Sequence, residues 1–531
     1  MPFRMFARSL PGRTRFPPSA VPWIVLLVQA LFAIALYGPT LQLGLLSDAW
    51  VYVEQAEQGP RAALTQVIGW HYIPLMSVAN ALAWPFLGAN ASGYQAITIA
   101  LQVVLAHLGY RLGLLLFGDV AVSLLASLLF LGSAAYYELT FWPAVGHTYV
   151  LAAVPFLLGL RTAIGMAGGE RPRGAALRLA GWFGAAILSY SGMVTLLPLA
   201  AIVLVLGRFL GLAGTPARPW RDPKEWLSVA GDLLPSAAVL VVPVVAKTLF
   251  FPAEMAGATY LRFDWLRVYT LDRALAAVFS LRGSSTALNE LVTLGSGVRG
   301  GPWLKVLVWG WLLLALAVLA RATWRSRTLA SPLLLSWLLL QLGLTALSIP
   351  VASRHTHLSA LPAALLSAAA LRQAGLFLAS RWRGGRFLAL APMVLGGLAL
   401  LAGAWFDLQR ALDAGRQATD LVRRGAVEIR AALANHPGPV TLTLVDLPSM
   451  TYGGDLGAYA FTNGTDSMVR LVSGRGDVTV DLRRTPERRV NVANGSRPLD
   501  ASERRALAAD PARIVLVFDP QTGDLRPPRV E

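Results

Sequence analysis

Long apolar segments recur along most of this 531-residue chain, and they constrain its fold more than any other feature. A helix needs about 20 apolar residues to cross the roughly 30 Å hydrocarbon core of a bilayer. The chain is 55% hydrophobic and only 14% charged, whereas soluble domains carry about 25% charged residues. The pattern therefore predicts a polytopic membrane protein. The segments lie near 22–45, 94–116, 120–136, 148–167, 228–250, 303–320, 331–351, 358–380 and 387–406.

The stretch 177–207 lies between two basic loops, and we interpret it as a hairpin of two short helices that turns at 189–192. With this hairpin the chain has about eleven transmembrane helices. The basic clusters between helices then all fall on the cytoplasmic side, as the positive-inside rule requires. Those clusters are Arg171/Arg173/Arg178, Arg208/Arg218/Arg221/Lys224, Arg321/Arg325/Arg327 and Arg381/Arg383/Arg386.

The N-terminal segment 1–20 carries four arginines and precedes an apolar run that is longer than the core of a signal peptide. No clean small-residue cleavage site follows that run, so we expect a retained first helix and a cytoplasmic N-terminus. The membrane domain is predicted to cover 21–407, with outer loops at 46–92, 136–147 and 251–302. The first of these loops contains a helix that we expect to lie in the interface, because its Trp70, Tyr72 and Trp84 suit the headgroup region.

The tail, 408–531, has the composition of a soluble domain, with 17 Arg against 15 Asp and Glu. A helical pattern from 408 to 433 ends at Pro437-Gly438-Pro439. Strand-like runs follow at 440–445, 478–482, 489–494 and 513–518, and 501–509 is typical of a short helix. The predicted fold is thus an all-α polytopic membrane domain plus a small C-terminal α/β extracytoplasmic domain.

Composition also excludes some classes of function. The chain has no cysteine, which excludes disulfides, thiolate metal sites and a cysteine nucleophile. The net charge of +17 comes from short loops between apolar segments and reflects topology. We find no P-loop, zinc-finger or RNA-recognition pattern, so nucleic acid is not a predicted partner.

Ionisable residues gather at the predicted outer ends of the helices. Charged groups near membrane depth are costly and tend to be functional. Two carboxylates and several cations that face one outer vestibule suit a reaction in which a base activates an acceptor hydroxyl and cations hold an anionic leaving group, such as a lipid phosphate. The residues are Asp48, Glu138, His147, Lys247, Arg354, His355 and His357.

Each of these residues also has a simpler explanation. Asp48 could cap the helix that starts the first outer loop, and Glu138 could be solvated. Arg354, His355 and His357 could be interfacial anchors, Lys247 could extend its amine to the headgroups, and arginines such as Arg262 in the third loop could contact them. Asn463-Gly464-Thr465 is most simply a turn.

The order of these motifs resembles the GT-C superfamily of polyprenyl-phosphate-sugar-dependent glycosyltransferases, and most closely the protein O-mannosyltransferases and related bacterial multi-pass enzymes. The similarity covers about 20–380. An acidic motif follows the first helix, a Glu in the second loop stands four residues before a Trp, and a late Arg-aromatic motif with a Pro opens a helix. Here these are Ser47-Asp48-Ala49-Trp50, Glu138 with Trp142, and Arg354-His355-Thr356-His357-Leu358 with Pro362.

The sequence departs from this pattern at several positions. Ser47 stands where many relatives have a second acid, and Ile73 stands where they have the arginine of an aromatic-Arg-Pro motif. A Ser-Lys-Glu turn that is common in relatives is Ser189-Tyr190-Ser191 in this chain.

The resemblance implies a mechanism with inversion at the sugar. Asp48 would be the general base, and Glu138 would orient the acceptor or Asp48. The lipid phosphate would be held by Arg354, His355, His357, Lys247 and Arg262, while Tyr72, Trp142 and His147 would line the vestibule for the acceptor. Some relatives bind a divalent cation, but one Asp and a distant Glu are a thin ligand set, so no metal site is predicted.

The predicted partners are a polyprenyl-phosphate sugar and a glycan, lipid or protein acceptor, and the predicted location is the bacterial inner membrane. Two other classes of function remain open at this point. A transporter or flippase of lipid-linked sugars would place ionisable residues at mid-membrane and often contain an internal repeat. A non-catalytic scaffold with this fold would leave Asp48, Glu138 and Arg354 far apart.

Overall fold

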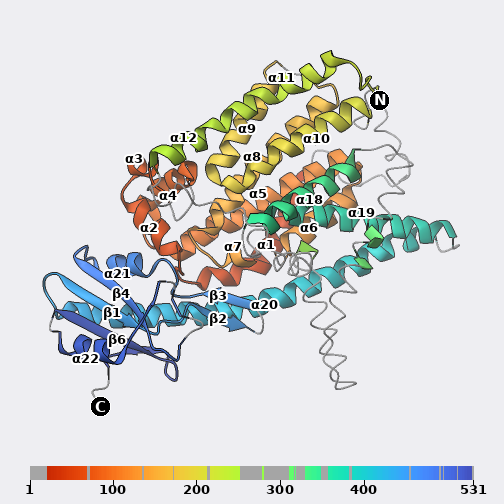
Figure 1. Ribbon diagram of the computed structural model, residues 1–531. Coiled ribbons are helices and arrows are strands. Elements are labelled where there is room, and N and C mark those ends of the chain that lie inside the picture. Colours follow the sequence, from red (N-terminus) through yellow and green to blue (C-terminus); the bar gives the residue numbers. More distant parts are fainter. Residues whose placement is uncertain are drawn as a thin grey trace.

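In the computed structural model, a bundle of apolar helices continues into a compact α/β domain (Figure 1). The structure describes residues 21–67, 72–133, 135, 137–170, 173–211, 216–250, 278–279, 310–311, 313–315, 317, 329–348, 357–381, 385–453, 456–488, 492–493, 495–510 and 512–528. Among them are seven helices long and apolar enough to cross a membrane. The chain is therefore a multi-pass membrane protein, while the count of about eleven spans stays a prediction.

The helices of the bundle follow the predicted segments. The first part contains α1 (Val21–Tyr37), the 3-10 helix η3 (Gly38–Gln42), α2 (Ala49–Glu57), α3 (Pro60–Ala63), α4 (Pro74–Leu87), α5 (Ala91–Phe117), α6 (Val120–Leu131), α7 (Tyr137–Thr140) and α8 (Gly146–Ala167). The second part contains α9 (Ala175–Ser189), η5 (Ser191–Thr195), α10 (Leu196–Phe209), α11 (Pro223–Val239), α12 (Val241–Phe250), α18 (Ala330–Ser348), α19 (His357–Arg381) and α20 (Gly385–Ala434).

The predicted hairpin is confirmed, because α9 ends at Ser189 and η5 begins at Ser191. The predicted third loop and the span at 303–320 lie almost entirely outside the described residues.

Small residues let the helices at the centre of the bundle approach closely. A Cβ atom placed on Gly109 of α5 would lie 2.8 Å from Leu361 Cδ1 of α19, and one on Gly113 would lie 3.1 Å from Leu365 Cδ2. Helix α19 is buried along most of its length, which fits the rule that small residues line helix contacts in membranes. This packing fixes the start of α19, where His357 lies.

Helix α20 joins the two parts of the molecule. The sequence predicted a membrane helix at 387–406 and a separate tail helix at 408–433, but the two are one helix of 50 residues. No proline follows Pro392 within it, so nothing in the backbone forces a break. The predicted domain boundary at 407/408 therefore lies inside a continuous helix (Figure 1).

The C-terminal part is built on a mostly parallel sheet in the order β5-β4-β1-β6-β7. Its strands are β1 (Val440–Val445), β4 (Val478–Arg484), β5 (Arg497–Pro498), β6 (Arg513–Asp519) and β7 (Asp524–Arg526), the last antiparallel to β6. A hairpin of β2 (Met450–Gly453) and β3 (Leu456–Tyr459) and the helices α21 (Thr465–Ser473) and α22 (Ala501–Ala509) complete it.

Alternation along β6 explains how this sheet is covered. Ile514, Leu516 and Phe518 belong to a core that also contains Val422 and Ile429 of α20, because side chains along a strand point to alternate faces. The predicted strands at 440–445, 478–482 and 513–518 and the helix at 501–509 are confirmed. The strand predicted at 489–494 lies mostly outside the described residues, and the β2–β3 hairpin and α21 were not predicted.

Candidate functional site

The loop between η3 and α2 makes a tight turn at Ser47 and Asp48. Ser47 has a φ of 49°, a left-handed conformation that costs energy for a residue with a side chain. Asp48 occupies the N-cap position of α2, but its side chain makes no hydrogen bond that caps the helix. The capping explanation for Asp48 is therefore wrong. Its Oδ1 instead accepts a hydrogen bond of 3.3 Å from Ser47 Oγ.

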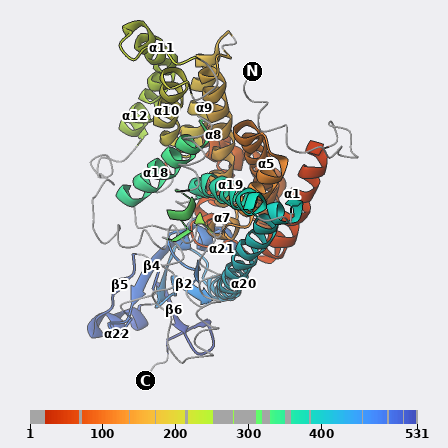
Figure 2. The ribbon, with the colours of Figure 1, turned by 90° about the vertical axis from the view of Figure 1, so that its right-hand side faces the viewer.

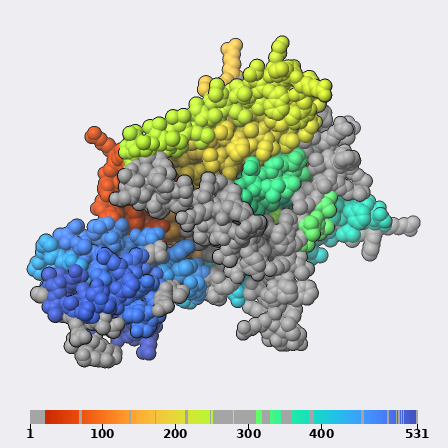
Figure 3. Space-filling view, in the orientation of Figure 1, coloured from red at the N-terminus to blue at the C-terminus, as the bar shows by residue number. Residues whose placement is uncertain are grey.

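The C-terminal domain holds this turn. The backbone N–H of Ser47 donates to the carbonyl oxygen of Ala460 at 3.1 Å, and the Ser47 hydroxyl is hydrogen-bonded to that of Thr462. A Cβ atom placed on Gly464 would lie 2.1 Å from the Ser47 carbonyl oxygen. Leu46 is buried in the hydrophobic core of the C-terminal domain. Figure 3 shows the first outer loop against this domain.

The second outer loop supports the same turn from another side. The indole N–H of Trp142 donates to the carbonyl oxygen of Leu46 at 3.0 Å, and its ring stacks on Tyr459 with centroids 5.6 Å apart. Trp142 is buried, so it braces the turn rather than facing solvent. Three segments far apart in the sequence thus meet at Ser47 and Asp48.

Glu138 lies on the four-residue helix α7 in the second outer loop, and its side chain is outside the described part of the structure. The backbone of α7 is well fixed. A Cβ atom at Gly146 would lie 1.7 Å from the Leu139 carbonyl oxygen, so only glycine permits α7 to pack against the start of α8. Thr140 accepts a hydrogen bond from Gln102 of α5 at 2.7 Å.

His147 occupies the first turn of α8 and is buried. Its Nε2 is 2.7 Å from Asn80 Oδ1 of α4, and its ring stacks on Tyr94 of α5 with centroids 5.9 Å apart. Among the described residues, its Nδ1 has no hydrogen-bond partner. These contacts join three helices, and the predicted contact of His147 with an acceptor stays a prediction.

His357 at the start of α19 lies in an aromatic cluster within the bundle. The edge of its ring meets Tyr149 with centroids 5.6 Å apart, and Tyr149 packs against Tyr190 at 4.4 Å. Tyr149 stands two residues after His147 on α8, and Tyr190 forms the turn of the confirmed hairpin. The start of α8 therefore lies next to the His357 cluster, and the loop before it lies next to the Ser47–Asp48 turn.

The structure describes the other predicted site residues only in part. Arg262, Arg354 and His355 lie outside the described residues, and Lys247 lies on α12 with a side chain that is not described. The Tyr72 hydroxyl donates to the Leu64 carbonyl oxygen at 3.0 Å, and its ring stacks on Phe250 of α12 with centroids 5.6 Å apart.

Three features of the site were missed in the sequence. One is the pair of Thr462 and Gly464. Gly464 belongs to Asn463-Gly464-Thr465, which was interpreted only as a turn, and Thr462 directly precedes that segment. Another is Asp407, which is 1% exposed. It lies on the face of α20 where Ala404 is close to Gly132 and Gly415 is close to Phe141. The third is an ion pair between α2 and α21.

That ion pair is formed by Glu54 and Arg470, whose Nη2 donates to Glu54 Oε2 at 3.0 Å and whose Nε also donates to the carboxylate. Burial alone would raise the pKa of Glu54, but hydrogen bonds from Arg470 and Ser467 and the Arg470 charge together hold it below its usual value. Burial raises the pKa of neighbouring Asp466, and the nearby Glu54 charge adds to this.

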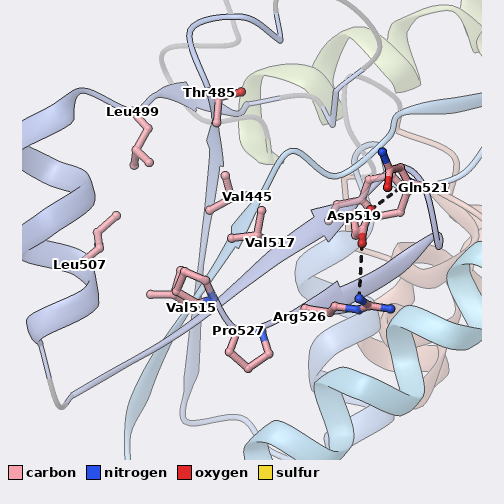
Figure 4. Close-up of a pocket in the computed structure, with 12 residues that line it drawn as sticks. Val445, Thr485, Leu499, Leu507, Val515, Val517, Asp519, Gln521, Arg526 and Pro527 are labelled. Carbon is pink, nitrogen blue, oxygen red and sulfur yellow. Dashed lines mark hydrogen bonds and ion pairs between the residues drawn. The ribbon is translucent and has the colours of Figure 1, made fainter. Parts of the chain in front are cut away.

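The described residues contain no group of three or more His, Asp or Glu side chains that could hold a metal ion. The described residues also form pockets, of which two concern the C-terminal domain and α20. One, of about 440 Å³, lies at the carboxyl ends of β1 and β6 beneath α22 and is lined by Val445, Val515, Val517 and Leu507 (Figure 4). The other, of about 320 Å³, lies between the first outer loop and α20.

No protein family model matches this sequence, and no curated protein sequence matches it. Among solved structures, ArnT from Cupriavidus metallidurans bound to undecaprenyl phosphate superposes with a TM-score of 0.50 at 14% identity, covering 95% of this chain and 94% of that one. The chain has a GT-C fold. The resemblance seen in the sequence is thereby confirmed at the level of the fold.

Two further solved structures resemble this chain. ArnT in the apo state gives a TM-score of 0.49 at 14% identity, again covering 95% of this chain and 94% of that one. The oligosaccharyltransferase AglB from Archaeoglobus fulgidus, in complex with an inhibitory peptide and a dolichol-phosphate, gives 0.49 at 12% identity. The alignment covers 86% of this chain but only 64% of AglB.

Proposed function

We propose that this protein is an integral membrane glycosyltransferase that transfers a sugar from a polyprenyl phosphate to a hydroxyl group on the extracytoplasmic side, with inversion. The observation that carries the proposal is the Ser47–Asp48 turn. The Asp48 carboxylate lies just beyond the first candidate span and does not cap α2. It belongs to a turn whose Leu46 and Ser47 are hydrogen-bonded by the second outer loop and by the C-terminal domain. A strained turn supported from several sides is a common feature of active sites.

In the proposed reaction, Asp48 accepts the proton of the acceptor hydroxyl. The hydroxyl oxygen then attacks the anomeric carbon from the side opposite the lipid phosphate, a new glycosidic bond forms, and the bond from that carbon to the phosphate oxygen breaks. Both electrons of the broken bond leave with the polyprenyl phosphate. General base catalysis of this kind contributes about 10²–10⁴-fold to a rate.

The charge that develops on the phosphate requires donors or cations nearby. His357, Arg354, His355, Lys247 and Arg262 are the proposed set, with Glu138 as the group that orients the acceptor or Asp48. His357 is supported by its place beside Tyr149, in the first turn of the helix that begins at the second outer loop. Tyr72, Trp142 and His147 shape the loops around this space.

The placement of two charged pairs favours a transferase over a carrier of lipid-linked sugars. Arg208 pairs with Asp232, and Arg372 pairs with Asp119 at 3.1 Å. Arg208 ends α10 and Asp119 follows α5, so both pairs lie at the helix ends away from the Ser47–Asp48 turn and the Tyr190 turn. A carrier is expected to place such groups near mid-membrane.

The test uses the purified full chain in nanodiscs with a panel of undecaprenyl-phosphate-linked hexoses and pentoses. A membrane extract and simple alkyl alcohols serve as acceptors. We expect at least one donor to release undecaprenyl phosphate together with a glycoside of inverted anomeric configuration. Movement of the intact donor across vesicles without any glycosidic product would instead identify a carrier.

A further inference from the structure

The pocket between the first outer loop and α20 lies just beyond the ends of two candidate membrane spans. The candidate span that includes α1 ends at Gln42, and the span of α5 begins at Ala91. The pocket of about 320 Å³ is bounded by Gly44 and Leu45, just beyond the first span, and by Ala91, at the start of the second. Because both spans reach the bilayer surface here, the pocket lies at the level of the lipid headgroups.

Helix α20 forms the opposite wall and brings positive charge to the pocket. Arg423 and Arg430 both line it, and residues seven apart lie on the same face of a helix. Gly44 N–H donates to Thr419 Oγ1 at 3.1 Å, which ties the loop to α20. Figure 2 shows α20 running from beside α19 in the bundle down into the C-terminal domain.

These two arginines are only weakly neutralised by the protein. Arg423 approaches Asp420 at 3.9 Å, and both side chains are about two-thirds exposed, so the pair contributes little. Arg430 donates its Nε to the Val472 carbonyl oxygen at 3.0 Å. The described residues that line the pocket include no acidic side chain, so the pocket has a net positive charge.

The other residues that line the pocket are apolar or carry a hydrogen-bond donor. Val427 lies between the two arginines on α20 and is 63% exposed. Trp50 also lines the pocket, and its buried indole N–H has no acceptor among the described residues. An apolar wall with cations and an indole at headgroup depth fits an amphipathic anion better than a free one, because a lipid supplies both the phosphate and the hydrocarbon.

We propose that this pocket binds the phosphate headgroup of an anionic phospholipid of the outer leaflet, with the phosphate between Arg423 and Arg430 and the acyl region against Val427 and Leu45. The described residues that line this pocket include none of the proposed donor-phosphate set. Leu45 and Trp50 flank the Ser47–Asp48 turn, so a bound lipid packs against the back of that turn and stabilises it.

Native mass spectrometry of the full chain released from nanodiscs tests this proposal. The probes are phosphatidylglycerol and phosphatidylcholine at equal mole fraction. We expect the wild-type chain to retain one phosphatidylglycerol, and the double variant Arg423→Gln/Arg430→Gln to bind it at least about tenfold more weakly, since each arginine near a membrane surface contributes to anionic-lipid binding. The double variant Arg423→Lys/Arg430→Lys should keep most of the binding.

Arg416→Gln is the matched control. Arg416 lies on the same helix and pairs with Asp413 three residues earlier at 3.5 Å, as Arg423 pairs with Asp420, but it does not line the pocket. Equal loss of phosphatidylglycerol in Arg416→Gln, or full retention in the glutamine double variant, would overturn the proposal. Displacement of the lipid by millimolar inorganic phosphate would also overturn it, because the site would then be one for a soluble anion.

Discussion

The two halves of the candidate site are held in different ways. The Ser47–Asp48 turn contacts Ala460, Thr462 and Gly464, more than 400 residues later in the chain. His357 packs against Tyr149, which in turn packs against Tyr190, and all three belong to the membrane bundle. The first half relies on hydrogen bonds and on the absence of a side chain at one glycine, and the second on ring contacts.

This difference assigns a role to the C-terminal domain. A change in that domain should disturb the proposed base and leave the His357 cluster intact, whereas a change at Tyr149 should do the reverse. In kinetic terms, the first should lower kcat, and the second should raise the KM for the lipid donor. The variants below test whether the two effects are independent.

Among the residues that support the site, the largest effect is expected at Gly464. In Gly464→Ala the new Cβ meets the Ser47 carbonyl oxygen at 2.1 Å, so the turn must shift. Overpacking of this kind costs about 1–3 kcal/mol, and a small displacement of a catalytic group can lower a rate about 100-fold. We expect kcat to fall to that extent with an almost unchanged KM for the donor, as measured by steady-state transfer.

Gly476→Ala is the control for this variant, because a Cβ there meets nothing within 4 Å. Its kinetics should match those of the wild type. A Gly464→Ala enzyme with unchanged kcat would show that the C-terminal domain does not position the turn.

A smaller effect is expected for the contact between Ser47 and Thr462. Thr462→Val keeps the shape but leaves the Ser47 hydroxyl without this partner, which costs about 1–3 kcal/mol for a buried group. In a double-mutant cycle with Ser47→Ala, the unfolding free energies should show a coupling of about 1 kcal/mol, with a parallel coupling in log kcat. Thr462→Ser should retain most of the unfolding free energy and most of kcat. Strictly additive effects of the two mutations would contradict a direct contact.

The other half of the site is tested at Tyr149. Tyr149→Leu removes a ring that meets His357, and aromatic contacts of this type contribute about 0.5–1.5 kcal/mol. We expect the KM for the donor to rise about two- to tenfold with little change in kcat. Tyr149→Phe keeps the ring and should behave like the wild type. A loss confined to kcat would mean that this cluster acts on the reacting groups themselves.

The smallest effect concerns the ion pair of Glu54 and Arg470. Because the pKa of Glu54 in the folded protein is lowered, its stabilisation is present above its usual value of 4.5 and is lost as the pH falls through the lower folded value. Arg470 is 39% exposed, so we expect less than about 1 kcal/mol.

The measurement compares the thermal unfolding of the wild type and Glu54→Gln at pH 7 and at pH 3.5. Because burial is the main cause of the raised pKa of Asp466, most of its contribution, which acts in the opposite direction, is shared by the two proteins. The wild type should be slightly more stable than Glu54→Gln at pH 7, and this difference in stability should be smaller at pH 3.5. A gap that widens in acid would contradict the assignment.

Much of the fold could be predicted because membrane helices and parallel strands leave local patterns. The hairpin of α9 and α10 followed from basic loops at both ends, and strands β1, β4 and β6 from short β-branched runs. The continuity of α20 was missed because a membrane span and an amphipathic tail helix have different compositions, and composition does not show whether the backbone breaks between them.

The site was harder to predict because its supports are distant in the sequence. The motif order predicted Asp48, Glu138, Trp142 and His357 as site residues, whereas Thr462 and Gly464 belong to a different domain. The segment Asn463-Gly464-Thr465 did mark a turn, yet nothing local shows that its glycine meets Ser47. Asp407 was missed for a similar reason, since burial of a carboxylate depends on what packs around it.

In the proposed mechanism, Asp48 is the general base and is held in place by the C-terminal domain. Asp48→Asn keeps the size of the side chain and removes its ability to accept a proton, so the variant should fold with unchanged thermal unfolding and bind undecaprenyl phosphate normally. Its transfer rate from the active donor should fall at least about 100-fold. Transfer at the wild-type rate by a correctly folded Asp48→Asn protein would contradict the account.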